Sequence, residues 1–155
     1  MLFRSGEFAA SLESLDRALR LKPDYPKARS TRGLTLAQLE RHEEAIAEFD
    51  RAIELRPSYA AAHSNRGISL QHLGRPEEAE ASFRKAIGCD PNFGDAWNNY
   101  AALLRRQRRY DESLRIYDRA LKLDPQNAKC FQSRGELFTE IKRTEDAFQI
   151  GRAHV

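Results

Sequence analysis

The sequence has few of the features that most readily assign a function. It contains two cysteines, Cys89 and Cys130, which are too few and too far apart for a disulfide framework or a cysteine zinc site. They are interpreted as small core residues. No apolar run reaches about 18 residues, the length that a membrane-spanning helix needs, and no export signal is recognisable. We therefore expect a chain that works in a reducing compartment, the cytoplasm, with no membrane partner.

Neither an excess of one charge nor a catalytic motif is present. The chain has 26 Lys and Arg against 23 Asp and Glu, a net charge of +3, so the charge balance does not point to nucleic acid. There is no Gly-rich phosphate loop, no H-E-x-x-H and no Cys or His pair at metal-ligand spacing. His42, His63 and His72 are interpreted as surface or packing residues. We expect no catalytic residue, no metal and no cofactor in this chain.

A strict period of 34 residues is the most informative feature that is present. It is marked by Pro23, Pro57, Pro91 and Pro125. Small and aromatic residues recur in phase with these prolines: Gly33, Gly67, Ala101 and Gly135; Ala45, Ala79, Ser113 and Ala147; Phe49, Phe83 and Tyr117; Ala52, Ala86 and Ala120. A fixed period of this size is typical of a stacked repeat architecture.

Each period predicts a helix, a tight turn and a second helix. Within residues 60–93, Gly74 suits the left-handed end of one helix and Pro76 suits the first turn of the next. Pairs of acidic residues mark the expected start of every second helix, where the helix dipole favours them: Glu43 and Glu44, Glu77 and Glu78, Asp111 and Glu112, Glu145 and Asp146. Asp24, Ser58 and Asn92, which follow the prolines, are expected to cap the next helix.

The small residues predict close contact between the two helices of a unit. The Gly or Ala of the first helix is expected to face the Ala or Ser of the second, with the aromatic residue one turn later filling the space beside them. Helices of about 14 residues are marginal alone, so the apolar stripes must be buried by stacking of successive units.

The pattern resembles the tetratricopeptide repeat, W-x2-L-G-x2-Y, then A-x3-F, then P. The best match is Trp97-x2-Tyr100-Ala101-x2-Leu104, followed by Ser113-x3-Tyr117 and Pro125. Arg32, Arg66 and Arg134 depart from it, standing where Leu is expected; their stems can cover apolar surface while their charged ends reach water. The resemblance implies an all-α, right-handed solenoid of 34-residue helix-turn-helix repeats.

The proline register divides the chain into units. Residues 1–25 supply the end of a first helix and a whole second helix, residues 26–59, 60–93 and 94–127 are complete repeats, and residues 128–149 are a truncated repeat. Residues 150–155, IGRAHV, break the register. They match one translation of a common sequencing-adapter sequence, which requires Lys, Gln or Glu at position 149, and Gln149 is present. We hypothesise an adapter-derived tail on a fragment; the alternative is a genuine irregular C-terminus.

The resemblance also implies a concave groove lined by the first helices. The residues it places there are Lys27, Thr31, Gln38, Asn65, Gln71, His72, Asn98, Asn99, Arg105, Arg106, Lys129 and Ser133. The family's carboxylate clamp is mostly absent, since Ser64, Ile68 and Ser133 occupy three of its positions. Asn65 and Asn99 look like part of the asparagine ladder in arrays attached to O-linked N-acetylglucosamine transferases; the alternative is ordinary solvated asparagines.

The run RRQRR at residues 105–109 is the one conspicuous charge cluster. Basic residues favour a helix C-terminus, which is the structural interpretation. The functional one is that Arg105 and Arg106 grip a carboxylate or phosphate of a ligand. Binding of nucleic acid would need similar clusters in neighbouring units, and none is present.

The sequence therefore predicts a non-catalytic protein-interaction scaffold that binds a peptide or protein segment in its groove, with no small-molecule substrate. One alternative is the acceptor-binding segment of a larger bacterial glycosyltransferase, and a second is nucleic-acid binding through Arg105–Arg109. Phe131, Phe138 and Phe148 are expected to be poorly covered, so self-association is also expected.

Overall fold

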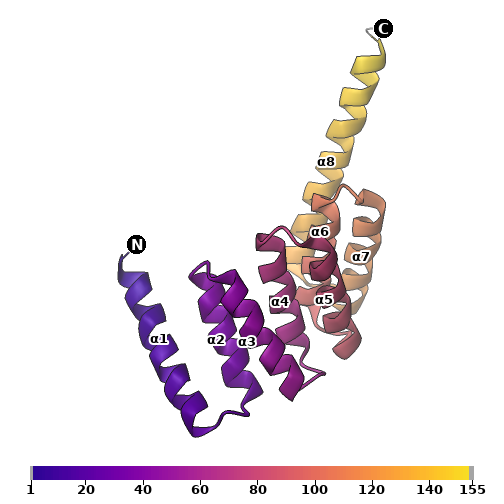
Figure 1. The fold of residues 1–155 in the computed structure, drawn as a ribbon. Coiled ribbons are helices and arrows are strands. Elements are labelled where there is room, and N and C mark those ends of the chain that lie inside the picture. The colour runs from indigo at the N-terminus through magenta and orange to yellow at the C-terminus, as the bar shows by residue number, and fades with distance from the viewer. Residues whose placement is uncertain (1, 154–155) are drawn as a thin grey trace. The chain divides into compact units, whose positions relative to one another are not determined.

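The computed structural model describes the backbone of residues 2–153 and the side chains of residues 7–145. In this range the chain is all-α, with short connections and no strand (Figure 1). The helices are α1 (Leu2–Leu21), α2 (Pro26–Gln38), α3 (His42–Leu55), α4 (Ala60–His72), α5 (Pro76–Cys89), α6 (Gly94–Arg106), α7 (Tyr110–Leu123) and α8 (Ala128–Ala153). Among the residues described, no helix is long and apolar enough to cross a membrane.

The chain divides into two compact units, the first ending at Ala96 and the second starting at Trp97. In the first unit α1 packs on α2, α2 on α3, α3 on α4, and α4 on α5. In the second unit α7 packs on α8. In each of these pairs, helices that are neighbours in the sequence are neighbours in space, as expected where each helix must bury its apolar stripe against the next.

Close contact between the paired helices is confirmed in three repeats. A Cβ added at Gly33 would lie 2.7 Å from a Phe49 ring carbon and 3.0 Å from the Ala45 carbonyl oxygen. One added at Gly67 would lie 2.7 Å from the Phe83 ring. In the third repeat, the Ser113 hydroxyl donates a hydrogen bond of 2.8 Å to the Ala101 carbonyl oxygen. The small residues therefore let the aromatic side chains lie directly on the facing backbone.

The turn between the paired helices is built in the same way each time. Gly74 has a φ of +69°, and Glu40 and Arg108 take its place in the other repeats with φ of +59°. This left-handed residue ends the first helix, and Pro76 begins α5 as predicted. Glu40 and Arg108 bear the strain that glycine avoids, because an L side chain disfavours this backbone region.

An arginine follows each left-handed residue and holds the start of the next helix. Its guanidinium group makes two parallel hydrogen bonds to the glutamate three residues later, with distances of 2.6–2.8 Å. These pairs are Arg41 with Glu44, Arg75 with Glu78, and Arg109 with Glu112. The glutamates lie in the first turns of α3, α5 and α7, where the sequence placed acidic residues.

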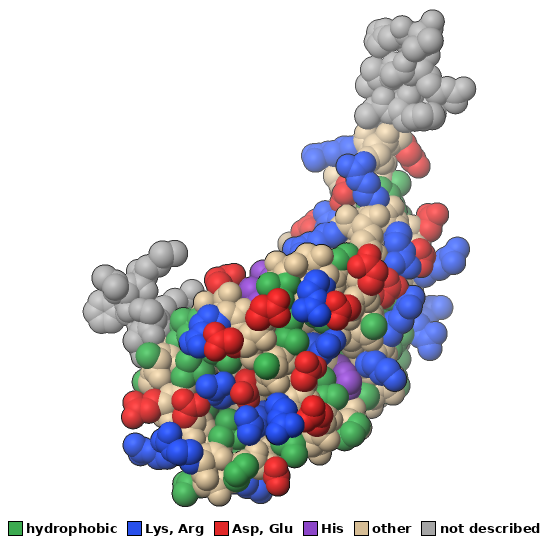
Figure 2. All heavy atoms as spheres, in the orientation of Figure 1, with side chains coloured by type: hydrophobic (Ala, Val, Ile, Leu, Met, Phe, Trp, Pro, Cys, Tyr) green, Lys and Arg blue, Asp and Glu red, His purple; other side chains and the backbone are tan. Residues whose placement is uncertain are grey.

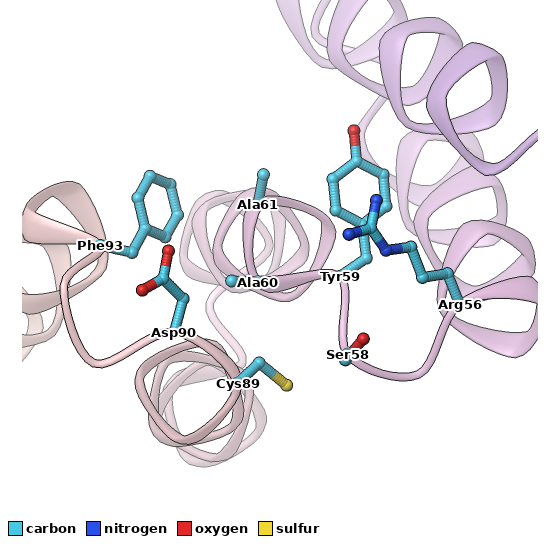
Figure 3. A pocket seen from close by; sticks show the side chains of 8 residues that line it. All are labelled: Arg56, Ser58, Tyr59, Ala60, Ala61, Cys89, Asp90 and Phe93. Atoms are coloured by element: carbon cyan, nitrogen blue, oxygen red, sulfur yellow. The ribbon is translucent and has the colours of Figure 1, made fainter.

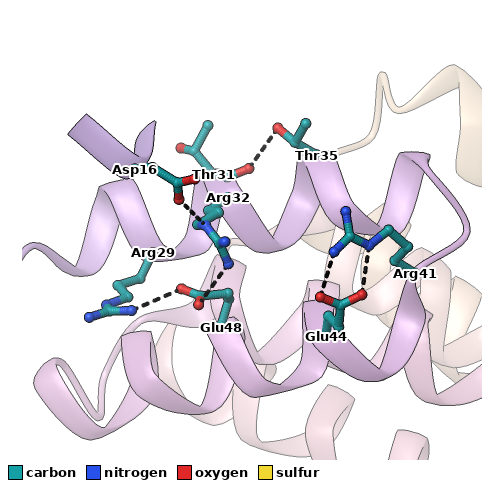
Figure 4. Close-up of polar contacts among 8 residues, drawn as sticks. All are labelled: Asp16, Arg29, Thr31, Arg32, Thr35, Arg41, Glu44 and Glu48. Atoms are coloured by element: carbon teal, nitrogen blue, oxygen red, sulfur yellow. Dashed lines mark hydrogen bonds and ion pairs between the residues drawn. The ribbon is translucent and has the colours of Figure 1, made fainter. Parts of the chain in front are cut away.

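Three arginines that depart from the family pattern join successive helix pairs. Arg32 Nε lies 2.8 Å from Asp16 Oδ1 (Figure 4), Arg66 Nε lies 2.6 Å from Asp50 Oδ1, and Arg134 Nε lies 2.8 Å from Asp118 Oδ1. Their charged ends are thus paired with aspartates of the preceding helix as well as reaching toward water. In the sequence, the one repeat with Tyr100 in place of this arginine also has Arg84 in place of the aspartate. In these repeats the arginine and the aspartate are therefore either both present or both replaced.

The prediction of a turn in the first and last repeats was wrong. α1 runs without a break from Leu2, and α8 continues from Ala128 to Ala153 through the expected turn near Lys142. Ala147 is therefore about 18 Å along the same helix from Gly135 and cannot face it. Gly151 stands where the inner repeats have the aromatic residue of the second helix. A second helix here would lack that packing contact, so the backbone keeps its helical hydrogen bonds. Predictions about Phe148 and residues 150–155 concern side chains outside the described range.

The predicted helix caps were also displaced by one residue. Tyr25 and Tyr59, and not Asp24 and Ser58, occupy the N-cap positions of α2 and α4, and neither side chain caps its helix. Asn127 does cap α8, because its Oδ1 accepts a 3.0 Å hydrogen bond from the Cys130 backbone amide. A basic side chain of the preceding segment lies over each ring instead, Lys22 at 5.3 Å from the Tyr25 centre and Arg56 at 5.1 Å from the Tyr59 centre.

Candidate peptide-binding site

A hollow of about 490 Å³ in the second unit brings three of the predicted groove residues together. Arg105 and Arg106 reach it from α6, and Ser133 reaches it from α8. Its full lining is Ala102, Arg105, Arg106, Arg108, Tyr117, Ser133, Glu136 and Glu140. The site is therefore polar and charged on its walls, with the fully buried Tyr117 beneath them.

Arg105 is held inside this hollow by two carboxylates of α8. Its Nε lies 2.7 Å from Glu140 Oε2, and its Nη1 lies 2.9 Å from Glu136 Oε2. The Tyr110 hydroxyl donates a 3.0 Å hydrogen bond to the other oxygen of Glu140. Hydrogen bonding to Arg105 lowers the pKa of both glutamates, and the bond to Glu140 raises the pKa of Tyr110. Burial raises the pKa of Tyr117. A ligand anion must compete with two internal carboxylates for Arg105.

Arg105→Met should reduce stability at neutral pH and have less effect in acid. The pKa values of Glu136 and Glu140 are lowered in the folded state. Their contribution to the free energy of unfolding is therefore present above the ordinary glutamate pKa of about 4.3, and it is lost as the pH falls through the lowered values. Urea midpoints of wild type and variant, measured from pH 7 down to pH 3, should therefore converge below about pH 4. An equal difference at all pH values would contradict this network.

The rest of the basic run has structural roles that follow from the repeat. Arg108 is the left-handed turn residue, and Arg109 holds Glu112 at the start of α7. With Arg105 bound to α8, the structural interpretation accounts for three of the four arginines. Arg106 is exposed at the rim of the hollow.

The other predicted residues of the second unit differ in accessibility. Asn98 is only 4% exposed and accepts a hydrogen bond of 3.8 Å from the buried Cys130 thiol, so it serves the interior and not an open face. Asn99 is half-buried, and Lys129 is exposed at the start of α8. The expected line of groove residues is thus interrupted at Asn98.

The predicted groove residues of the first unit lie exposed or half-buried on α2 and α4. Lys27, Thr31 and Gln38 are exposed on α2, and the Thr31 hydroxyl donates a 2.9 Å hydrogen bond to the Lys27 carbonyl oxygen of its own helix. On α4, Asn65 and Gln71 are half-buried and His72 is exposed. A groove that runs through both units therefore remains a prediction.

Sequence spacing missed one cluster in the first unit. The rings of His42 and His72 are stacked with their centres 4.4 Å apart and their planes 19° apart. Nε2 of His42 lies 3.2 Å from Glu40 Oε2. The histidines are 30 residues apart, so no short motif marks them. The repeat register is the signal that could have found them. Positions 42 and 72 correspond to Tyr110 and Glu140 two repeats later, and these two side chains are hydrogen-bonded.

A second hollow, of about 470 Å³, lies among the connections of the first unit (Figure 3). Tyr59 and Phe93 flank Ala61 there, and Arg56 and Asp90 supply opposite charges. Cys89 also lines this hollow and is half-buried, with its thiol 3.6 Å from the Pro57 carbonyl oxygen. The prediction that Cys89 is a core residue was therefore wrong, whereas Cys130 is fully buried as predicted. The connection after Cys89 leaves it only partly covered.

Charges of both signs are interspersed over the face seen in Figure 2, with no patch of basic residues alone. Many of these charges are matched locally, as in the ion pairs of Arg29 and Arg32 with Glu48 (Figure 4). This face does not favour a strongly acidic polymer over other partners.

Helix pairs that recur every 34 residues, joined by a left-handed turn and packed through small residues, define the class of α-helical repeat proteins. The chain belongs to the tetratricopeptide repeat family, whose sequence profile matches residues 2–60, 31–92, 64–128 and 101–155. The predicted all-α solenoid class is confirmed. None of the curated proteins compared with this chain matches it.

Solved structures share this fold. The tetratricopeptide domain of Arabidopsis OM64 is 22% identical, with a TM-score of 0.69, and the match covers 74% of this chain and 95% of that one. The first such domain of Spaghetti (RPAP3), bound to the HSP90 peptide SRMEEVD, is 17% identical, with a TM-score of 0.71 and coverage of 76% and 95%. MamA is 16% identical, with a TM-score of 0.77 and coverage of 94% and 85%. At these low sequence identities, the structural similarity shows a shared fold and nothing further.

Proposed function

We propose that this chain is a non-catalytic protein-interaction scaffold that binds a peptide or protein segment. The observation that carries the proposal is the hollow of the second unit, where Arg105, Arg106 and Ser133 converge from α6 and α8. Bound peptide in the structurally similar RPAP3 domain supports a ligand of this kind. Family membership supports a role in binding, while the choice of ligand depends on the residues of this chain.

The charges in the hollow favour a segment with an acidic residue. Three arginines and two glutamates line it, which leaves one positive charge in excess. Arg105 is engaged by both glutamates, so the exposed Arg106 and its neighbour Arg108 are the groups that a ligand carboxylate meets. Arginine binds a carboxylate through paired hydrogen bonds, which would orient the segment.

The proposal is tested with peptides selected from a random displayed library on the purified chain. We expect Arg106→Glu to weaken binding of an acidic selected peptide by about tenfold, because attraction becomes repulsion and a charge-assisted hydrogen bond is lost. Fluorescence anisotropy at two salt concentrations measures the effect. Lys122→Glu is the matched control, since it makes the same charge change on α7 outside the hollow. Equal weakening by both variants, or selection of no peptide, would argue against the site.

The peptide SRMEEVD serves as a specificity control. Ser64, Ile68 and Ser133 occupy positions of the family's carboxylate clamp that Lys, Asn and Arg would need to fill. We therefore propose that this chain does not select for a terminal carboxylate. Amidation of the peptide's C-terminus should leave its affinity unchanged.

A further inference from the structure

We propose that Glu40, His42 and His72 form a binding site for a divalent transition-metal ion of the Zn²⁺ type. One ligand atom from each of these side chains lies within 4.8 Å of the others. All three residues lie in the first unit, in the turn between α2 and α3, at the start of α3 and at the end of α4. The site is separate from the proposed peptide-binding hollow, which lies in the second unit.

The fold brings these residues together through two features of the repeat. Glu40 takes the left-handed conformation that ends α2, and this turn places its carboxylate 3.2 Å from His42 Nε2. Stacking of the next repeat then sets His72, the last residue of α4, against the His42 ring at 4.4 Å. A bound ion would therefore join two successive repeats, and its binding would be coupled to their packing.

His42 has properties that a purely structural role does not explain. It is only 8% exposed, and its Nδ1 is buried without a hydrogen-bond partner. A buried polar atom without a partner destabilises the fold, because it loses its hydrogen bonds to water and gains none in return. The corresponding positions of the next two repeats hold Pro76 and Tyr110, so the repeat itself does not require histidine. His42 therefore lowers the stability of the fold at a position where other repeats use other residue types.

The set of ligands selects the class of metal. Two imidazoles and one carboxylate are typical ligands of Zn²⁺ and neighbouring transition metals, whereas Mg²⁺ and Ca²⁺ prefer oxygen ligands alone. Three protein ligands leave a fourth position open for water or another group. The two rings are nearly parallel, so their lone pairs do not yet converge. His72 is exposed whereas His42 is buried, so His72 is the ring that turns toward the ion.

Nearby arginines do not leave the site strongly positive. Arg41 is bound to Glu44, and Arg75 is bound to Glu78 and lies 3.6 Å from Glu43. Each guanidinium charge is therefore balanced by a carboxylate within its own turn. Glu40 then supplies the negative charge that partly neutralises a divalent ion.

The test is isothermal titration of ZnCl₂ into the chain without an affinity tag. We expect one ion per chain and a rise in Tm of a few degrees at saturation. His72→Gln and Glu40→Gln should each weaken binding by about tenfold or more. Both residues are exposed, and Gln38 holds the position of His72 in the preceding repeat, so these variants keep the fold.

His63→Gln is the matched control. It removes another histidine of α4, the helix that carries His72. The Nε2 of His63 lies 2.9 Å from the Pro57 carbonyl oxygen, and His63 does not belong to the cluster. Its Zn²⁺ affinity should equal that of wild type. The visible spectrum with Co²⁺ should show four-coordinate bands in wild type and lose them in His72→Gln. Absence of Zn²⁺ binding, or binding unchanged by both cluster variants, would overturn the proposal.

Discussion

Gly67→Ala is expected to lower the free energy of unfolding, and Gly135→Ala is expected to raise it. Both glycines lie inside helices and occupy the same position of the repeat. A Cβ at Gly67 would lie 2.7–2.9 Å from three carbons of the fully buried Phe83 ring. Overpacking of this kind costs about 1–3 kcal/mol, and the better helix propensity of alanine returns about 0.5–1 kcal/mol. The difference of the two central values is a net loss of about 1 kcal/mol at Gly67.

At Gly135 the same substitution meets open space. No described atom lies within 4 Å of a Cβ placed there, so only the gain in helix propensity of about 0.5–1 kcal/mol remains. Urea unfolding at low protein concentration, where association does not contribute, measures both variants. The opposite signs are the critical result. Equal destabilisation by the two variants would show that Gly135 is packed like Gly67, and equal stabilisation would show that the Phe83 ring moves aside at little cost.

The interior repeats could be predicted from the sequence because each local signal agreed with the period. Gly74 and Pro76 fixed a turn, and the small residues fixed the contact between paired helices. The helices of the terminal segments could not be predicted from the same period. Lys142 stands at the turn position of α8, but a turn forms only where a second helix has apolar residues to bury. The period alone does not state whether that packing is present.

The candidate site was predictable only in part for a related reason. The register placed Arg105, Arg106 and Ser133 on α6 and α8, and these three residues line one hollow. It did not show that Glu136 and Glu140 neutralise Arg105, because the register gives positions along the helices and not the direction in which a long side chain reaches. It likewise missed the pairing of His42 with His72, because these residues belong to different repeats and occupy different positions of the period.

The exposed stripe of α8 is expected to pair with the same stripe of a second copy of the chain. Phe131 and Phe138 are 52% and 46% exposed, and Gly135 lies between them at helical spacing on the same face. In the inner repeats the space over the corresponding glycine is filled by Phe49 or Phe83. At Gly135 no described atom lies within 4 Å of that position, so an aromatic side chain of a second copy could fill it. In an antiparallel pair each copy would cover the exposed phenylalanines of the other, because the stripe is self-complementary.

Light scattering over a range of concentrations measures this association. Wild type should approach twice the chain mass of 17.8 kDa, and Phe131→Ser with Phe138→Ser should remain at one chain mass. Both side chains are exposed, so the helical circular dichroism should not change. Leu123→Ser is the matched control, since Leu123 is 44% exposed on α7 outside the stripe and its loss should leave the dimer intact. A wild-type chain that stays monomeric at high concentration would show that a second copy does not fill the space at Gly135.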